Sequence, residues 1–333
     1  MADIASVRGN EKNQEIQKHL DQQAARKNLI NNIIPYVGLV FCVVFFTIVT
    51  GGNFLSADNM GNLINQGFVL SLIAIGSAFV YAHGGMDFSV GAVSGVAQLV
   101  LALTVAAGVP LPLCLLLTIL VCILGATCTA SITLLLGVPV FVGSMCVRTS
   151  FTGILKTFTE KNEIALLYQD YAYMNNPVLK GLILVIIIAV AYYLFNYTTI
   201  GKYNKAIGGN PRTSQQAGVS RRKMVYIAYL LMGLCVGLAS IFAFFRTCKV
   251  SAYSGNGYEF NVMMAIVLGG FPMAGGDRAK VSSAIIGALT VTALSNGLSM
   301  WGLDTTLISG VKGILFVIIV ALSYDRSAGK LVS

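Results

Sequence analysis

The sequence predicts an all-α polytopic membrane protein with about ten transmembrane helices, and three observations support this. Of the 333 residues, 56% are hydrophobic and only 11% are charged, whereas soluble domains carry roughly 25% charged residues. The mean hydropathy is +0.77. Apolar runs also recur along the whole chain, and a helix needs roughly 20 apolar residues to cross a bilayer. This composition argues against a soluble fold with a large core.

The predicted spans follow one another with short connections. They lie near residues 30–49, 67–83, 89–107, 111–136, 138–158, 180–196, 225–246, 261–271, 281–301 and 307–324. The run at 261–271 is too short to cross alone, so we expect a broken or partly re-entrant helix there. Residues 1–28 are polar and mixed in charge, which favours a cytoplasmic tail before a retained first span over a cleavable signal peptide. The transmembrane domain is then 29–326, followed by a cytoplasmic tail at 327–333.

A strongly basic loop at 197–224 sets the expected orientation. It holds six basic residues and no acidic one: Lys202, Lys205, Arg212, Arg221, Arg222 and Lys223. Basic loops stay on the cytoplasmic side. With ten crossings and both termini inside, fifteen basic residues fall on the cytoplasmic side. Four fall outside: Lys161, Lys180, Arg246 and Lys249. This bias accounts for the net charge of +9 better than binding to nucleic acid does.

The same loop predicts a short helix from about Pro211 to Ala217. Asn210 and Pro211 are typical of an N-cap and first helical residue, and Gly218 of a stop. A helix of about two turns is marginal alone in water, so we expect a cytoplasmic partner to hold it.

The predicted helix at 225–246 has basic residues in its first turn, which is electrostatically unfavourable. Ser220 is the expected N-cap, yet three basic residues at 221–223 follow it, and cations there oppose the helix dipole by about 0.3–1 kcal/mol each. Lipid headgroups or an acidic groove on a partner would each explain the arrangement.

Two glycine-rich stretches resemble one another, at 84–91 (GGMDFSVG) and 269–277 (GGFPMAGGD). Each follows an apolar run and leads into a helix rich in small residues. We therefore expect an internal duplication of about five helices per half, with Gly-interrupted helices at a pathway. Small residues four apart, such as Gly233 with Gly237 and Ser283 with Gly287, predict close helix packing.

Four ionisable residues fall in or beside apolar runs, where they are costly and usually face a polar interior or a partner. Asp87 is expected to cap the following helix or, alternatively, to line the pathway. Lys312 is expected to reach outward or to pair with a carboxylate. Arg148 is expected to pair internally with an unidentified partner, and Lys156 to reach the outer face.

Other candidate chemistry is sparse. His83 beside two glycines favours a capped or solvated side chain over a ligand. The seven cysteines lack CxxC spacing and are interpreted as small buried side chains. No nucleophile–His–carboxylate set, metal cluster or GxxxxGK[ST] loop occurs in the sequence, so the chain has no visible means of using ATP by itself. The polar, aromatic segment 159–176 suits either an external partner or a solvated connection.

Five motifs in order resemble the membrane subunits of bacterial ATP-binding-cassette sugar importers, the ribose/galactoside/xylose permease family. They are GGMDFSVG at 84–91, GKY with AIGGN at 201–210, GYEF at 257–260, VLGG with AGG at 267–276, and KG at 312–313 with Asp325. Two departures concern the cytoplasmic side. Residues 277–280 replace the family's Gly-rich sequence, and 211–219 lack its acidic residue. Contact with the ATPase is therefore expected to differ in detail.

The resemblance implies a non-enzymatic permease subunit in the bacterial plasma (inner) membrane, with no cofactor of its own. ATP and Mg would bind a separate cytoplasmic ATPase, an external binding protein would deliver a sugar, and the permease would pair as a homodimer or heterodimer. The implied ATPase contact comprises Gly208, Gly209, Asn210, Pro211, Arg212, Gln215 and Gly218. The implied pathway and structural motifs comprise Gly84, Gly85, Asp87, Ser89, Gly269, Gly270, Gly275, Gly276, Glu259 and Lys312. Membrane lipid is a further expected partner.

Two alternatives remain open on the sequence. A self-sufficient secondary transporter or channel could couple Asp87, Arg148 or Lys312 to protons or ions. A membrane-embedded enzyme is the other, although it lacks a recognisable catalytic set.

Overall fold

The computed structural model describes residues 33, 35–160 and 164–323. The predictions for the tails 1–28 and 327–333, and for Lys161 and Asp325, lie outside these residues. The described chain is almost entirely helical. Its elements are helix Pro35–Val49 and then η1 Asn53–Leu55, α2 Ala57–Ala82, α3 Val90–Ala106, α4 Leu111–Leu136, α5 Val140–Thr159, β1 Ile164–Ala165, α6 Tyr168–Tyr171, η2 Ala172–Asn175, α7 Pro177–Asn196, α8 Thr199–Gly209, α9 Pro211–Gln216, α10 Arg221–Thr247, β2 Lys249–Val250, α11 Tyr258–Leu268, α12 Val281–Met300 and α13 Thr305–Ser323.

Local sequence explains where several helices begin and end. Asn176 Oδ1 accepts a hydrogen bond of 2.8 Å from the Val178 amide, and Pro177 occupies the first turn of α7. Such caps satisfy amides that have no partner within the helix. Gly137 ends α4 in the left-handed conformation with φ 66°, as glycine commonly does after a helix.

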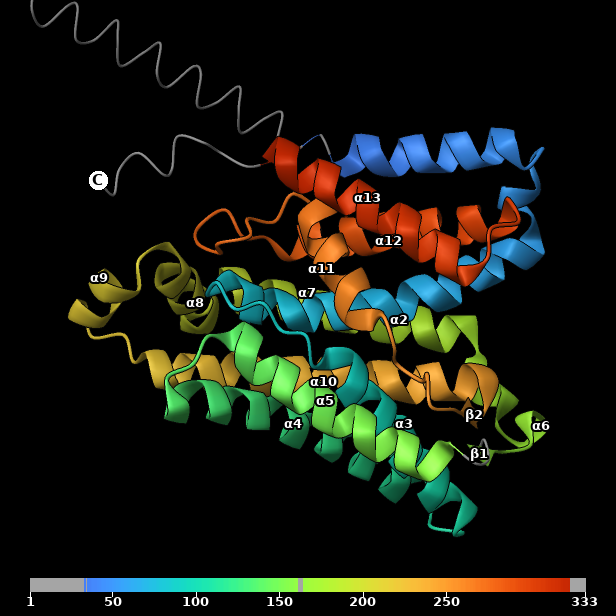
Figure 1. The fold of residues 1–333 in the computed structure, drawn as a ribbon, viewed down its shortest axis with the longest axis horizontal. Helices are drawn as coiled ribbons and strands as arrows, with labels where there is room; N and C mark the ends of the chain where they lie inside the picture. The colour runs from blue at the N-terminus through green and yellow to red at the C-terminus, as the bar shows by residue number, and fades with distance from the viewer. Residues whose placement is uncertain (1–32, 34, 161–163, 324–333) are drawn as a thin grey trace, which may run out of the picture.

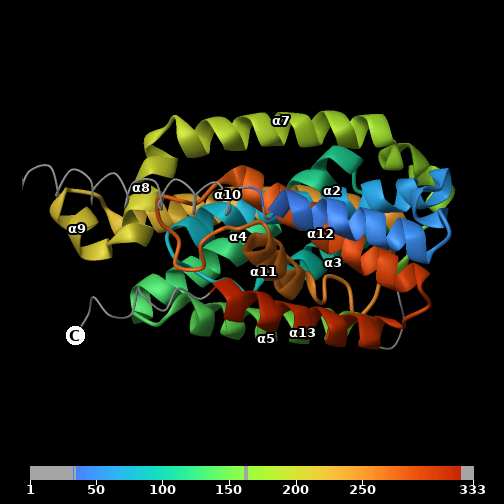
Figure 2. The same cartoon turned by 90° about the horizontal axis from the view of Figure 1, so that it is seen from above.

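Two long helices form the centre of the bundle. α2 and α10 pack against each other, α4 packs on α10, and α12 packs on α2. Most residues in the apolar stretches of α2, α10 and α12 are buried, whereas most of those in α4 and α7 are half-buried or exposed. Figure 2 shows α7 along one side of the molecule, with α5 and α13 on the other. The exposed apolar side chains of α7, such as Val178, Leu182 and Val185, suit contact with lipid.

Close helix packing confirms part of the small-residue pattern. A Cβ at Gly233 would lie 2.7 Å from the Ile123 Cα, and one at Gly237 would lie 2.9 Å from the Ile119 Cα. Both values are below a normal carbon–carbon contact, so α4 and α10 approach as closely as they do because these positions are glycine.

The predicted helical architecture is confirmed, but the number of crossings is not. Among the described residues, five helices are long and apolar enough to cross a membrane: α2, α4, α7, α10 and α12. The prediction that 261–271 is short agrees with α11, which has 11 residues. Ten spans and the internal duplication remain predictions.

The two ends of the bundle differ in structure. At one end, α8 and α9 extend beyond the long helices, and at the other lie α6 and the small sheet (Figure 1). In that sheet β1 pairs antiparallel with β2, placing Ile164 opposite Val250 and Ala165 opposite Lys249. This pairing joins part of the 159–176 segment to β2, which directly follows α10. The segment is therefore packed against the bundle in part and is not only a solvated connection.

The prediction for the cysteines is partly wrong. Cys114, Cys122, Cys235 and Cys248 are buried and Cys42 is half-buried, but Cys128 and Cys146 are exposed. All seven are free thiols. Cys128 and Cys146 lie on helices whose outer faces are uncovered by the rest of this chain, and an apolar run alone does not indicate which face that is.

Candidate functional site: a glycine junction, an exposed short helix and a buried ion pair

The two similar glycine stretches meet in space. The Gly276 amide donates a hydrogen bond of 2.9 Å to the Ala82 carbonyl at the end of α2, and Gly276 has a φ of 97°, which only glycine adopts readily. A Cβ at Gly84 would lie 3.0 Å from the Ala274 carbonyl oxygen. We call this contact between 82–85 and 274–276 the glycine junction.

The end of α8 packs into the glycine junction through Gly208. A Cβ at Gly208 would overlap the Ala82 carbonyl oxygen and would lie 2.6 Å from the Gly276 amide nitrogen. Gly209 has no atom within 4 Å of its Cβ position. The two neighbouring glycines therefore differ: Gly208 is required for backbone approach, whereas Gly209 faces open space.

The predicted short helix is present as α9. Asn210 Oδ1 accepts hydrogen bonds of 3.1 Å from the amides of both Arg212 and Thr213, and Pro211 is the first helical residue. Gly218 follows with a φ of 83°. In α9 only Ser214 is buried, and Arg212 and Gln215 are exposed. The helix is thus held at its start and presents most of its surface outward.

Lys205 lies on the inner side of α8. Its Nζ lies 4.6 Å from the centre of the Phe195 ring, a distance typical of a cation–π contact. Burial lowers the pKa of Lys205, partly offset by the nearby Asp277 carboxylate. This residue anchors α8 to the end of α7 and is less available to a partner than the exposed Lys202.

Asp87 supports the start of α3, close to the predicted capping role. Its Oδ1 accepts hydrogen bonds from the Ser89 amide at 2.6 Å and the Ser89 hydroxyl at 2.7 Å. The N-cap residue itself is Ser89, so the predicted position is shifted by two residues. The Ser89 hydroxyl also lies 3.2 Å from that of Thr129 on α4. These bonds fix the turn that follows the glycine junction.

The His83 side chain is half-buried, and the prediction that it is capped or solvated stays a prediction. His83 follows α2 as its C-cap residue, but its Nε2 is buried without a hydrogen-bond partner in the described part of the chain.

The structure identifies the internal partner of Arg148. Its Nη2 lies 2.6 Å from Glu259 Oε1, joining α5 to α11. The Glu259 side chain is 5% exposed and that of Arg148 is 34% exposed. A Cβ at Gly91 would overlap Glu259 Oε2, so glycine at that position makes room for the carboxylate.

Lys312 has an amide partner in place of the predicted carboxylate. Its Nζ donates a hydrogen bond of 2.8 Å to Asn261 Oδ1, joining α13 to α11. Lys312 is only 8% exposed, so the prediction that it reaches outward is also wrong. Asn261 was missed because a single amide in an apolar run gives little sequence signal.

Lys180 is a second buried lysine that the sequence placed in an external loop. It is 2% exposed, lies in α7, and donates hydrogen bonds to the side-chain oxygens of Asn65 on α2 and Asn175. Lys180 thus contributes to packing between α7 and α2, in addition to its place in the predicted distribution of basic residues between the two sides of the membrane. Lys156 is exposed near the end of α5, and the prediction that it reaches the outer face of the membrane stays a prediction.

The predicted site residues therefore do not form one cluster. Gly84, Gly85, Gly275 and Gly276 lie with Gly208 at the glycine junction, and Gly269 and Gly270 follow α11. Glu259 and Lys312 lie with Arg148 and Asn261 around α11. In the described residues, no group of three or more His, Cys, Asp or Glu side chains is arranged to hold a metal ion.

Comparison with known proteins assigns the chain to a family. The family described as "Branched-chain amino acid transport system / permease component" matches residues 59–320. The chain belongs to this permease family. Its members are membrane transport components rather than enzymes, and the exposed apolar helices agree with a multi-pass membrane location.

Several relatives are similar over most of their length. The ribose import permease protein RbsC of Bacillus subtilis (strain 168) is 30% identical, over 88% of this chain and 93% of the relative. The galactofuranose transporter permease protein YtfT of Escherichia coli (strain K12) is 27% identical, over 80% and 79%. The autoinducer 2 import system permease protein LsrC of Photorhabdus luminescens is 25% identical, over 89% and 90%. No solved structure matches.

Proposed function

We propose that this permease is the translocating subunit of an ATP-binding-cassette importer for a monosaccharide-type sugar. Relatives named as permeases for ribose and galactofuranose support the substrate class. ATP hydrolysis would take place on a separate cytoplasmic ATPase. A second permease subunit would complete the pathway, and an external binding protein would deliver the sugar.

The observation that carries the proposal is the exposed helix α9. A six-residue helix is too short to be stable alone, yet α9 is capped by Asn210 and follows α8, whose end packs into the glycine junction. We infer that α9 is the coupling helix. Force applied to it by the ATPase would reach the end of α2 and the loop between α11 and α12 through Gly208, which contacts Ala82 and Gly276. Such coupling requires that the ATPase bind two conformers of the permease with different affinities.

The polar groups around α11 are proposed to line or gate the sugar pathway. Ionisable residues at membrane depth usually face a bundle interior or an aqueous cavity. Arg148, Glu259 and Lys312 all contact or belong to α11, and α11 is too short to cross the bilayer alone. A discontinuous helix of this kind is typical of transport pathways.

Mild-detergent purification of the tagged chain from its native membrane, followed by mass spectrometry, tests the proposal. We expect a cassette ATPase in stoichiometric amount and either one permease chain or two. Reconstituted chain should transport labelled monosaccharide only with the ATPase and ATP. Proton-dependent uptake by the chain alone would instead establish a secondary transporter.

A further inference from the structure

Three buried polar side chains gather beside the glycine junction without completing their hydrogen bonds. In the part of the chain that the structure describes, Asp87 Oδ2 and the hydroxyls of Tyr81 and Tyr229 have no hydrogen-bond partner. Asp87 is 2% exposed, Tyr81 1% and Tyr229 0%. Unpartnered polar atoms at such depth are uncommon in folded proteins, and each one needs an explanation. We call these three residues the Asp87 cluster.

The members of the Asp87 cluster come from two helices and a turn. Tyr81 lies in the last turn of α2, Tyr229 lies in α10, and Asp87 lies in the turn between α2 and α3. Both phenols interact electrostatically with the Asp87 carboxyl group. The Tyr229 hydroxyl is close enough to hydrogen-bond with that group, although the two are not aligned as a regular bond in this conformer. The Tyr229 ring centre lies 6.5 Å from that of His83.

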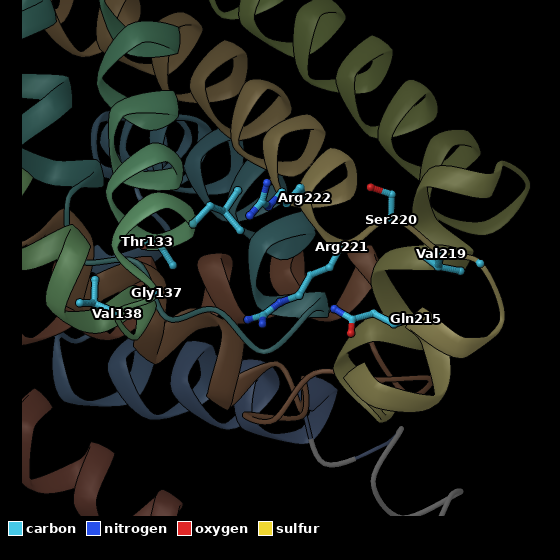
Figure 3. A pocket seen from close by; sticks show the side chains of 10 residues that line it. Thr133, Gly137, Val138, Gln215, Val219, Ser220, Arg221 and Arg222 are labelled. Carbon is cyan, nitrogen blue, oxygen red and sulfur yellow. The ribbon is translucent and has the colours of Figure 1, made fainter.

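No basic side chain offsets a negative charge on Asp87. Among the described residues, Asp87 takes part in no ion pair. Arg221 at the start of α10 interacts electrostatically with His83, but in Figure 3 its side chain extends toward Gln215. Both residues line a hollow between α4 and α10. A carboxylate buried without a cation is so costly that such groups are commonly neutralised by a proton.

The two oxygens of the Asp87 carboxyl group have different surroundings. Oδ1 accepts hydrogen bonds from the Ser89 amide and the Ser89 hydroxyl, and the Ser89 hydroxyl also meets that of Thr129 on α4. A neutral carboxyl group accepts through one oxygen and donates through the other. Since Oδ1 already accepts two bonds, the proton belongs on Oδ2, where the Tyr229 oxygen can accept a bond. Tyr229 can then donate its own hydrogen toward Tyr81.

We propose that Asp87 carries a proton in this conformer and donates a hydrogen bond to Tyr229, which makes the Asp87 cluster a proton-binding site beside the glycine junction. An ionised carboxylate could accept bonds from both phenols, but its charge would remain buried without a cation. The proposal concerns the chain itself and does not depend on which solute is transported.

The proton would favour one conformer of the permease. The turn that holds Asp87 connects the glycine junction to α3. A conformer in which this turn moves away from α10 brings the carboxyl group into water, where it ionises near neutral pH. A rise in pH therefore favours the conformer with an exposed Asp87 over the one described here.

Infrared spectroscopy of the purified full chain tests the proposal, because a neutral carboxyl group has a C=O band that a carboxylate lacks. Near neutral pH we expect this band in the wild type and its loss in Asp87→Asn. The matched control is Asp58→Asn, which changes an exposed aspartate on α2 and should keep the band. Tyr229→Phe should keep the band but shift its frequency, because the carboxyl group loses its acceptor. This shift assigns the band even if Asp87→Asn does not fold.

Thermal unfolding at several pH values gives an independent readout. Asparagine keeps an acceptor for Ser89 and a donor toward Tyr229, so Asp87→Asn should match the unfolding temperature of the wild type near neutral pH. As the pH is raised, the wild type should lose more stability than Asp87→Asn. The reason is that the folded state binds a proton that the unfolded state has already released.

Three outcomes would overturn the proposal. Absence of a carboxyl band that depends on Asp87 would show that the residue is ionised. A wild-type unfolding temperature that sodium raises and choline does not, with no such difference in Asp87→Asn, would show a carboxylate that binds a cation. A band that Tyr229→Phe leaves unmoved would show that Tyr229 is not the acceptor.

Discussion

Arg148 Nη2 lies 2.6 Å from Glu259 Oε1, and this ion pair joins α5 to the short helix α11. The carboxylate side of the pair is buried, whereas about a third of the arginine side chain is exposed. The fold therefore holds Glu259 through a residue that still reaches the surface of the chain. Because the two side chains differ in burial, substitutions of Arg148 and of Glu259 should have different effects on stability.

Arg148→Met should destabilise the protein more than Glu259→Gln. Removing the cation leaves a buried carboxylate without its partner, which costs about 3–5 kcal/mol at a fully buried site and less here because the arginine side is partly exposed. Thermal unfolding in detergent measures the difference. Lys156→Met is the matched control, since Lys156 is exposed on the same helix. Equal unfolding temperatures for Arg148→Met and the control would refute this role.

Gly208→Ala and Gly209→Ala should have different effects although the residues are adjacent. A methyl group at Gly208 overlaps the Ala82 carbonyl, so α8 must move off the glycine junction and transport should be lost. The space at Gly209 is open, so the fold should tolerate its substitution, and only binding of the ATPase could be affected. Unfolding temperature and ATPase co-purification separate the two cases. A Gly208→Ala protein with full transport would contradict the proposed path of coupling.

Asn210→Ala should loosen α9 without unfolding the bundle. It removes the two hydrogen bonds to the amides of Arg212 and Thr213, and loss of such a cap costs about 0.5–2 kcal/mol. Affinity for the ATPase should fall several-fold, with little change in unfolding temperature. Asn210→Asp should restore most of the affinity because aspartate is an equally good cap. If the Ala and Asp variants bind alike, capping is not what the residue contributes.

Lys312→Met should separate stability from transport. The Lys312 ammonium is buried, and its hydrogen-bond partner Asn261 is neutral, so an apolar side chain of similar length should leave the unfolding temperature unchanged or raise it. Transport should fall at least about tenfold if the charge serves the pathway. Reconstituted uptake and thermal unfolding are measured on the same preparation. Full uptake by the variant would assign Lys312 to packing alone.

The helical class, most helix positions and the short helix α9 could be predicted from the sequence alone. These follow from local physics: apolar runs of span length, the Asn210–Pro211 start and the Gly218 stop each act within a few residues. The run 111–136 coincides with α4, and the predicted helix 211–217 differs from α9 by one residue. The family motifs likewise pointed to a permease before any contact was known.

Which distant residues meet could not be predicted from the sequence and is seen only in the folded chain. Arg148 with Glu259, Lys312 with Asn261, and Gly208 with Ala82 are each set by how helices pack, and a residue's own neighbours do not encode that arrangement. The same reason explains the errors for Cys128 and Cys146, whose burial depends on which face of a helix another helix covers. Sequence spacing identified glycines that allow close approach, but the approach itself exists only in the folded chain.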